Sequence, residues 1–172
     1  MTDAEVKTEV RPISLEDLDA VFLIDHRIRE MGKAITYANL TTERIFTIDR
    51  HVGRLAKPTS YVDLIRGDVS ELLEFGFVAE VGGHVCGFIL GRVVHVGEAA
   101  TEVGQILIVG VNPAYQRRGI ATQLVNAICE KYRSRGIKTV LIAIDQRDKE
   151  LLSFVDHMDF SVGHLIDYSK AL

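Results

Sequence analysis

The chain has 172 residues, of which 47% are apolar and 26% are charged, and these proportions are ordinary for a soluble globular protein. The formal net charge of −4 offers no general attraction to nucleic acid or to an anionic membrane, so we expect neither as a partner. No apolar run reaches the length of a membrane span, and the polar, acidic start of the chain is unlike a signal peptide. A chain of this length predicts one domain over residues 1–172.

Cysteine and histidine usage gives no indication of a disulfide or a metal site. Cys86 and Cys129 each stand in an apolar run, and we interpret them as small buried side chains. The six histidines are scattered, and none falls at a spacing typical of metal ligands, such as His-Glu-x-x-His. We therefore expect no metal and a reducing, cytoplasmic setting.

The N-terminal part of the chain predicts a strand followed by a helix that packs on a sheet. Residues 10–13 form the strand, and Ser14 followed by Asp17 is typical of a capping box at a helix N-terminus. Apolar residues then recur at helical spacing as far as Ile28. In residues 31–74 some apolar positions keep this spacing, but glycines and a proline interrupt them, which favours short helices joined by loops.

A β-hairpin is predicted over residues 77–90, because Gly82-Gly83 separates two apolar runs and suits the primed turns that hairpins favour. The second strand can extend to Val96, and a loop follows. The next strand covers residues 102–111 and ends before Pro113, which has no N–H to donate to a strand ladder.

The segment that follows combines a strand end, a turn and a glycine at the start of a helix. Gln116, Gly119 and Ala121 stand in the pattern Gln-x-x-Gly-x-Ala, and two arginines lie between the glutamine and the glycine. Such a junction can present bare backbone N–H groups to a phosphate. Because Gly119 has no side chain, a diphosphate could approach the backbone closely.

This unit resembles the coenzyme A-binding motif of the GNAT superfamily of N-acetyltransferases. The resemblance implies the α/β (α+β) fold of that superfamily, in which helices flank a central mixed, largely antiparallel sheet. It also implies acetyl-CoA as the acyl donor, with its pantetheine arm along the strand and its pyrophosphate on main-chain N–H groups. The cofactor-binding residues implied are Val109, Gly110, Val111, Gln116, Arg117, Arg118, Gly119, Ile120, Ala121 and Thr122.

After the motif, the sequence predicts a helix, a buried strand, a second helix and one or two closing strands. The first helix carries apolar residues from Ile120 to Ile128 and ends at Gly136. Residues 139–144 form the buried strand. Asp145 and Asp148 can cap the second helix, and residues 160–172 close the chain. The apolar last strand could pair with a second copy, so a homodimer is one hypothesis.

The sequence departs from the superfamily where its members often carry catalytic groups. Val155 occupies the position of the usual tyrosine acid and cannot donate a proton, Asp159 replaces a glycine, and Ala143 stands where some members have a glutamate. We take Glu102 as the candidate general base and Tyr168 as the candidate acid. The alternatives are an exposed charge near a strand start and a half-buried strand tyrosine.

Three hypotheses for function follow. The first is an N-acetyltransferase in which the neutral amine of a small molecule, a protein N-terminus or a lysine attacks acetyl-CoA directly in a ternary complex. The second is a non-catalytic acyl-CoA sensor or interaction module, which the missing tyrosine and glutamate favour. A third hypothesis is transfer of a longer acyl chain, for which an apolar tunnel beside Ile142 and Ile144 would be needed.

Overall fold

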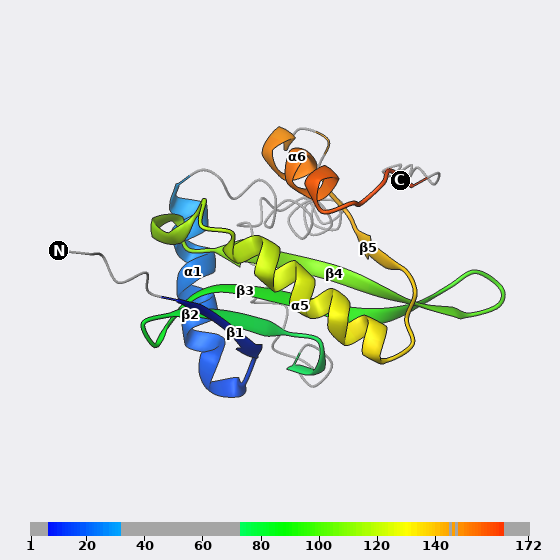
Figure 1. The fold of residues 1–172 in the computed structure, drawn as a ribbon, viewed down its shortest axis with the longest axis horizontal. Coiled ribbons are helices and arrows are strands. Elements are labelled where there is room, and N and C mark those ends of the chain that lie inside the picture. Colours follow the sequence, from blue (N-terminus) through cyan, green and yellow to red (C-terminus); the bar gives the residue numbers. More distant parts are fainter. Residues whose placement is uncertain (1–6, 32–72, 145, 147, 164–172) are drawn as a thin grey trace, which may run out of the picture.

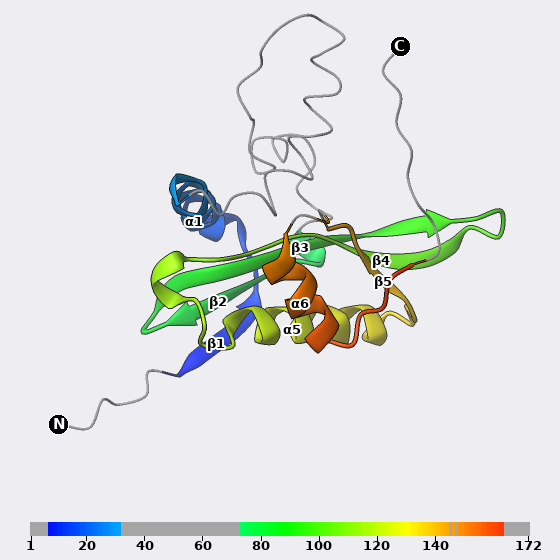
Figure 2. The ribbon, with the colours of Figure 1, turned by 90° about the horizontal axis from the view of Figure 1, so that it is seen from above.

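The computed structural model describes residues 7–31, 73–144, 146 and 148–163. In this part of the chain a five-stranded mixed sheet has the order β1-β2-β3-β4-β5, with antiparallel neighbours except for the parallel pair β4 and β5. Figure 1 shows the sheet with helix α5 lying across it, and Figure 2 shows helix α1 on the opposite face. The strands are β1 (Thr8–Pro12), β2 (Phe77–Val81), β3 (His84–Val96), β4 (Thr101–Val111) and β5 (Val140–Ile142). This arrangement confirms the predicted mixed, largely antiparallel sheet flanked by helices.

The N-terminal elements form as predicted, around a capping box. A short 3-10 turn, Leu15–Asp17, leads into α1 (Leu18–Glu30). The Ser14 N–H and hydroxyl both donate to the Asp17 carboxylate, at 2.8 and 3.0 Å. Arg11 on β1 donates to the same carboxylate and to Glu80 on β2, which ties the turn to the sheet.

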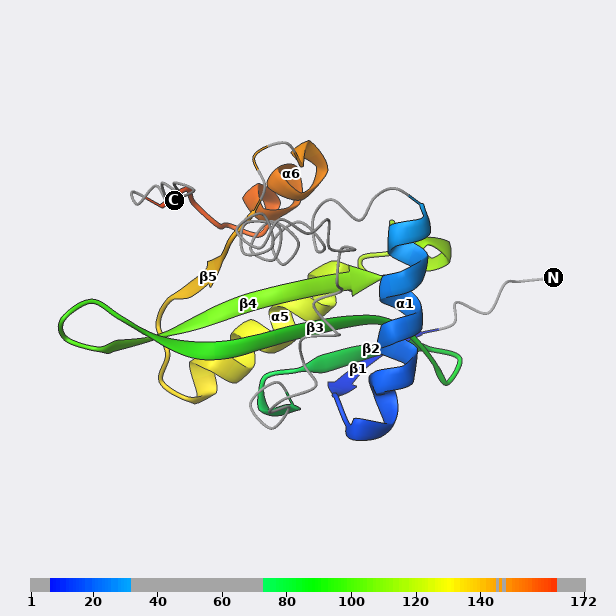
Figure 3. The same cartoon turned by 180° about the vertical axis from the view of Figure 1, so that it is seen from behind.

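The hydrophobic core has two layers, one on each face of the sheet. Under α1, buried apolar side chains of the helix, among them Val21 and Ile28, pack against Phe88 and Ile108 of the central strands. Figure 3 shows α1 crossing this face near one end of β3 and β4. Under α5 (Ile120–Ser134), the larger layer includes the helix residues predicted from their spacing, Ile120, Leu124 and Ile128, all buried.

The long β3–β4 ladder contains a bulge that matters for the site. Leu90 pairs with Ile108 but the next residue, Gly91, pairs with Ile106, so Leu107 is an extra residue on β4. A bulge bends its strand and shifts the alternation of its backbone groups by one residue. The parallel ladder with β5 ends at the same place, at the pair of Ile106 with Ile142.

The prediction of a buried strand over residues 139–144 was wrong in length and in burial. Strand β5 has three residues, and Leu141 is 44% exposed. Among the described strands β5 pairs only with β4, because it lies at the edge of the order; an edge position leaves apolar side chains in solvent. The closing strands are absent from residues 160–163, and residues 164–172, with 32–72, lie outside the described residues.

Candidate functional site

The predicted motif lies at the end of β4 and shapes the start of α5. Pro113–Tyr115 form a 3-10 turn, which Asn112 caps by accepting a hydrogen bond from Ala114 N–H. The Gln116 side chain then folds back, and its Nε2 donates to the Val111 carbonyl at 3.1 Å. The glutamine of the motif therefore closes the loop on the strand from which it started.

Two residues of this loop adopt left-handed backbone conformations. Gly119 has φ +73° at the N-cap of α5, and Arg117 has φ +64°. A left-handed conformation is easy for glycine and strained for arginine. A Cβ placed on Gly119 would meet nothing within 4 Å, so no protein atom crowds the backbone at this position.

The start of α5 offers backbone donors to an anion. In the first turn, Ile120, Ala121 and Thr122 cannot bond within the helix, and no acceptor for their N–H groups lies among the described residues. The helix dipole adds a partial positive charge at this end. Left-handed and helical residues in succession make a concave set of N–H groups that binds anions. The geometry fits a phosphate or diphosphate.

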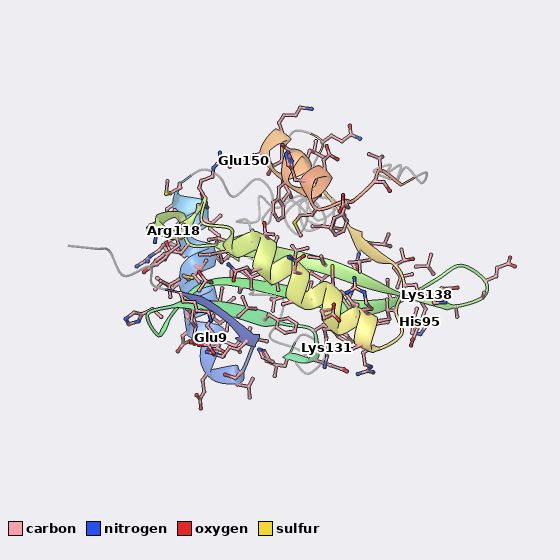
Figure 4. All side chains as sticks on the ribbon, in the orientation of Figure 1. Glu9, His95, Arg118, Lys131, Lys138 and Glu150 are labelled. Atoms are coloured by element: carbon pink, nitrogen blue, oxygen red, sulfur yellow. The ribbon has the colours of Figure 1, made fainter. Side chains whose placement is uncertain are left out.

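Arginine side chains flank these donors. Arg118 lies over the Tyr115 ring at 5.5 Å from its centroid, and among the described residues it forms no ion pair. Arg117 Nη2 lies 3.3 Å from Glu150 Oε1 on helix α6 (Lys149–His157), and Figure 4 shows Arg118 and Glu150 at this end of the molecule. Of these two arginines, Arg118 is thus the one without an ion pair among the described residues.

Beyond the bulge, the outer edge of β4 has no strand partner among the described residues. Asn112 N–H donates to the Cys86 carbonyl on β3, so by alternation Val111 and Val109 direct their backbone groups away from β3. Their side chains are buried under α5. No described strand pairs with β4 on this side after Ile106. Backbone donors and acceptors therefore line a path from the bulge to the turn over residues 116–119, which we call the anion-binding turn after the N–H donors beside it.

The candidate base from the sequence lies far from this path. Glu102 is five residues before the bulge at Leu107, or about 17 Å at the rise of a strand. Its side chain is 60% exposed and lies 3.6 Å from His95 Nε2, at the tip of the β3–β4 hairpin that Figure 4 marks with His95. Tyr168 lies outside the described residues. Val155, at the expected tyrosine position, is buried in α6.

A polar pair on β3 and β4 is recognisable only in the folded chain. Arg92 Nε donates to Gln105 Oε1 at 2.8 Å, and the two residues are direct neighbours across the ladder. In the sequence, Gln105 is only a polar residue on the strand that leads to the motif. Its partner lies 13 positions away, so the signal appears only with the strand register.

Other chemistry finds no support in the described residues. Cys86 and Cys129 are free thiols, and burial raises the pKa of both, as expected for packed side chains. Among the described residues no group of three histidines, cysteines or carboxylates could hold a metal ion. No described helix has the length and apolar character needed to cross a membrane.

Comparison with known proteins assigns this chain to a class. The sequence model of the GNAT family of acetyltransferases matches residues 42–160. The chain belongs to the GNAT acetyltransferase family. A mycothiol acetyltransferase of Rhodococcus erythropolis is 32% identical over 72 residues, which are 41% of this chain and 24% of that protein; the chain thus spans about a quarter of this relative's length.

Solved structures share the fold at low sequence identity. The aminoglycoside N-acetyltransferase AAC(6')-Iy, solved with CoA, has a TM-score of 0.69 at 15% identity over 100% of both chains. The ribosomal-protein-alanine N-acetyltransferase of Brucella melitensis has a TM-score of 0.64 at 11% identity, over 96% of this chain and 100% of that chain. At these identities the likeness establishes the architecture alone.

Proposed function

We propose that the protein is a cytoplasmic, single-domain N-acetyltransferase that uses acetyl-CoA. The observation that carries this proposal is the anion-binding turn at the start of α5, joined to the outer edge of β4. Family membership supports acetyl transfer, and a structural neighbour solved with CoA supports the donor. The whole of residues 1–172 is taken as the acetyltransferase domain.

The N–H groups at the start of α5 and the outer edge of β4 match two parts of CoA, its pyrophosphate and its pantetheine arm. The N–H groups at 119–122, with Arg118, would hold the pyrophosphate. The outward backbone groups of Val109 and the Val111 N–H would pair with the amides of the pantetheine arm, as an added strand does, while the Val111 carbonyl accepts from Gln116. Since the β4–β5 ladder closes at Ile106, the thioester would come to rest beside the bulge at Leu107.

Chemistry at that point requires little from side chains. The neutral amine attacks the thioester carbon, the tetrahedral intermediate collapses, the C–S bond breaks, and the thiolate takes up the proton lost by the amine. Backbone N–H groups at the outer edge would stabilise the oxyanion. Because the thioester is already activated, holding the amine in line supplies much of the acceleration. Glu102 and Tyr168 remain hypotheses for base and acid; the exposed position of Glu102 at the hairpin tip weighs against it.

A second candidate function is an acyl-CoA sensor without turnover. The burial of Val155 at the position of the usual proton donor favours it. Both functions need the same CoA site, so binding alone does not separate them. They differ in whether an amine is acetylated.

The test combines calorimetric titration of acetyl-CoA and CoA with an assay of thiol release. We expect affinity in the micromolar range, about −8 kcal/mol, and thiol release with at least one class in a panel of amines, amino acids and peptides. Release above the rate of hydrolysis supports the transferase, whereas tight binding with no release from any amine supports the sensor. An absence of binding to either nucleotide would overturn both functions.

A further inference from the structure

The Arg92–Gln105 pair occupies the face of the sheet opposite α5. A Cβ on Gly91 or on Gly104 would run into Tyr132 of α5, so both positions face that helix. Neighbouring residues in a strand point to opposite faces. Arg92 and Gln105, the next residues, therefore project from the other face, which is also the face that α1 covers farther along.

The pair lies next to the bulge, just beyond the area covered by α1. On β4, α1 packs over Ile108, whereas Gln105 comes before the extra residue Leu107. Both side chains of the pair are partly buried. An amine that approached a thioester at the bulge from this face would have the guanidinium about two residues away, on the order of 7 Å.

The guanidinium is held in a fixed orientation by a neutral partner. Its Nε donates to Gln105 Oε1 at 2.8 Å, and a neutral amide does not compensate the positive charge. Among the described residues no carboxylate forms an ion pair with Arg92. The backbone beneath is also fixed, because the Tyr132 hydroxyl lies 3.1 Å from the carbonyl oxygens of both Arg92 and Gln105. The two terminal nitrogens are then suited to a bidentate oxyanion.

We propose that Arg92, oriented by Gln105, selects an acceptor amine that also carries an anionic oxygen group, a carboxylate or a phosphate. The inference rests on the proposed N-acetyltransferase function, since it places the acceptor beside the thioester. It predicts an amine and an anion separated by a short spacer, and it sets this protein apart from enzymes whose acceptors are purely cationic. Arg92 acts in specificity and takes no part in the transfer of protons.

The test titrates amines into the CoA-saturated protein. The probes are amino acids of the series H₂N–(CH₂)n–COO⁻, the matching amino alcohols and diamines, and O-phosphoethanolamine. We expect the anionic members to bind more tightly than their uncharged or cationic counterparts. Arg92→Gln should weaken the binding of the anionic members by about 10-fold or more and leave the binding of the amino alcohols unchanged.

Two further variants sharpen this experiment. Gln105→Glu keeps a partner for Arg92 but cancels its charge, so it should weaken the same probes. Arg133→Gln removes an exposed cation of α5 that pairs with Glu130 and should change nothing. Equal binding of anionic and uncharged probes, or an equal loss for all probes in Arg92→Gln, would overturn the proposal. Titration of CoA alone into each variant reports separately on the proposed function, because failure there leaves no CoA site to which an acceptor could be added.

Discussion

Two glycines at opposite ends of α5 allow the CoA site to be tested with a matched control. Gly119 and Gly136 have φ +73° and +76°, and a Cβ at either position would meet nothing within 4 Å. Replacement of either by glutamate therefore carries the same left-handed strain, about 1–2 kcal/mol. Only Gly119 lies at the anion-binding turn, since a helix of 15 residues separates the two by about 22 Å.

The expected effect on binding follows from the added charge. A carboxylate about 5 Å from one phosphate charge is repelled by about 3 kcal/mol at an effective dielectric constant near 20. This repulsion corresponds to a weakening on the order of 100-fold. Gly119→Glu should thus bind acetyl-CoA on the order of 100-fold more weakly than Gly136→Glu in calorimetric titration, while both show similar thermal unfolding. Equal affinities in the two variants would refute the assignment of the pyrophosphate to this turn.

Three further predictions concern stability. Arg11 and the Ser14 donors lower the pKa of Asp17 to about 2 from its ordinary 3.8. This carboxylate therefore stabilises the fold above pH 4 by about 2 kcal/mol, and that contribution disappears as the pH falls towards 2. Chemical unfolding from pH 7 to pH 2 should show that loss in wild type but not in Asp17→Asn; parallel profiles would contradict it. Gly91→Ala should lower the free energy of unfolding by about 1–3 kcal/mol, because its Cβ would overlap the Tyr132 hydroxyl and lie 2.6 Å from Ile128 Cδ1. If this clash is the cause, Tyr132→Phe should cost less stability in the Gly91→Ala background than in wild type. Additive losses of the two changes in urea unfolding would argue against the clash. Asp159 has φ +61°, so Asp159→Gly should raise the free energy of unfolding by about 0.5–1 kcal/mol, and a lower Tm would show that the aspartate side chain contributes more than the strain costs.

Local signals in the sequence predicted much of this architecture. The capping box at Ser14, the Gly82-Gly83 hairpin and the helix that begins after Gly119 all formed as expected. Each depends on residues within a few positions of one another, for which turn chemistry and helix capping are decisive. The left-handed conformation of Gly119 in the motif is also a local feature, because the backbone at a helix start depends on residues close by in the sequence.

Features that depend on pairing between distant strands were decided by the tertiary structure. The bulge at Leu107 exists only relative to β3, and it turns the backbone groups of Val109 towards the outer edge. The same register brings Arg92 against Gln105 and places Glu102 at the hairpin tip. Strand β5 was expected to be buried because its residues are apolar, yet its burial depends on its place in the strand order. Apolar pattern fixes which residues prefer the interior, whereas register and strand order, which arise from contacts far apart in the sequence, decide which of them reach it.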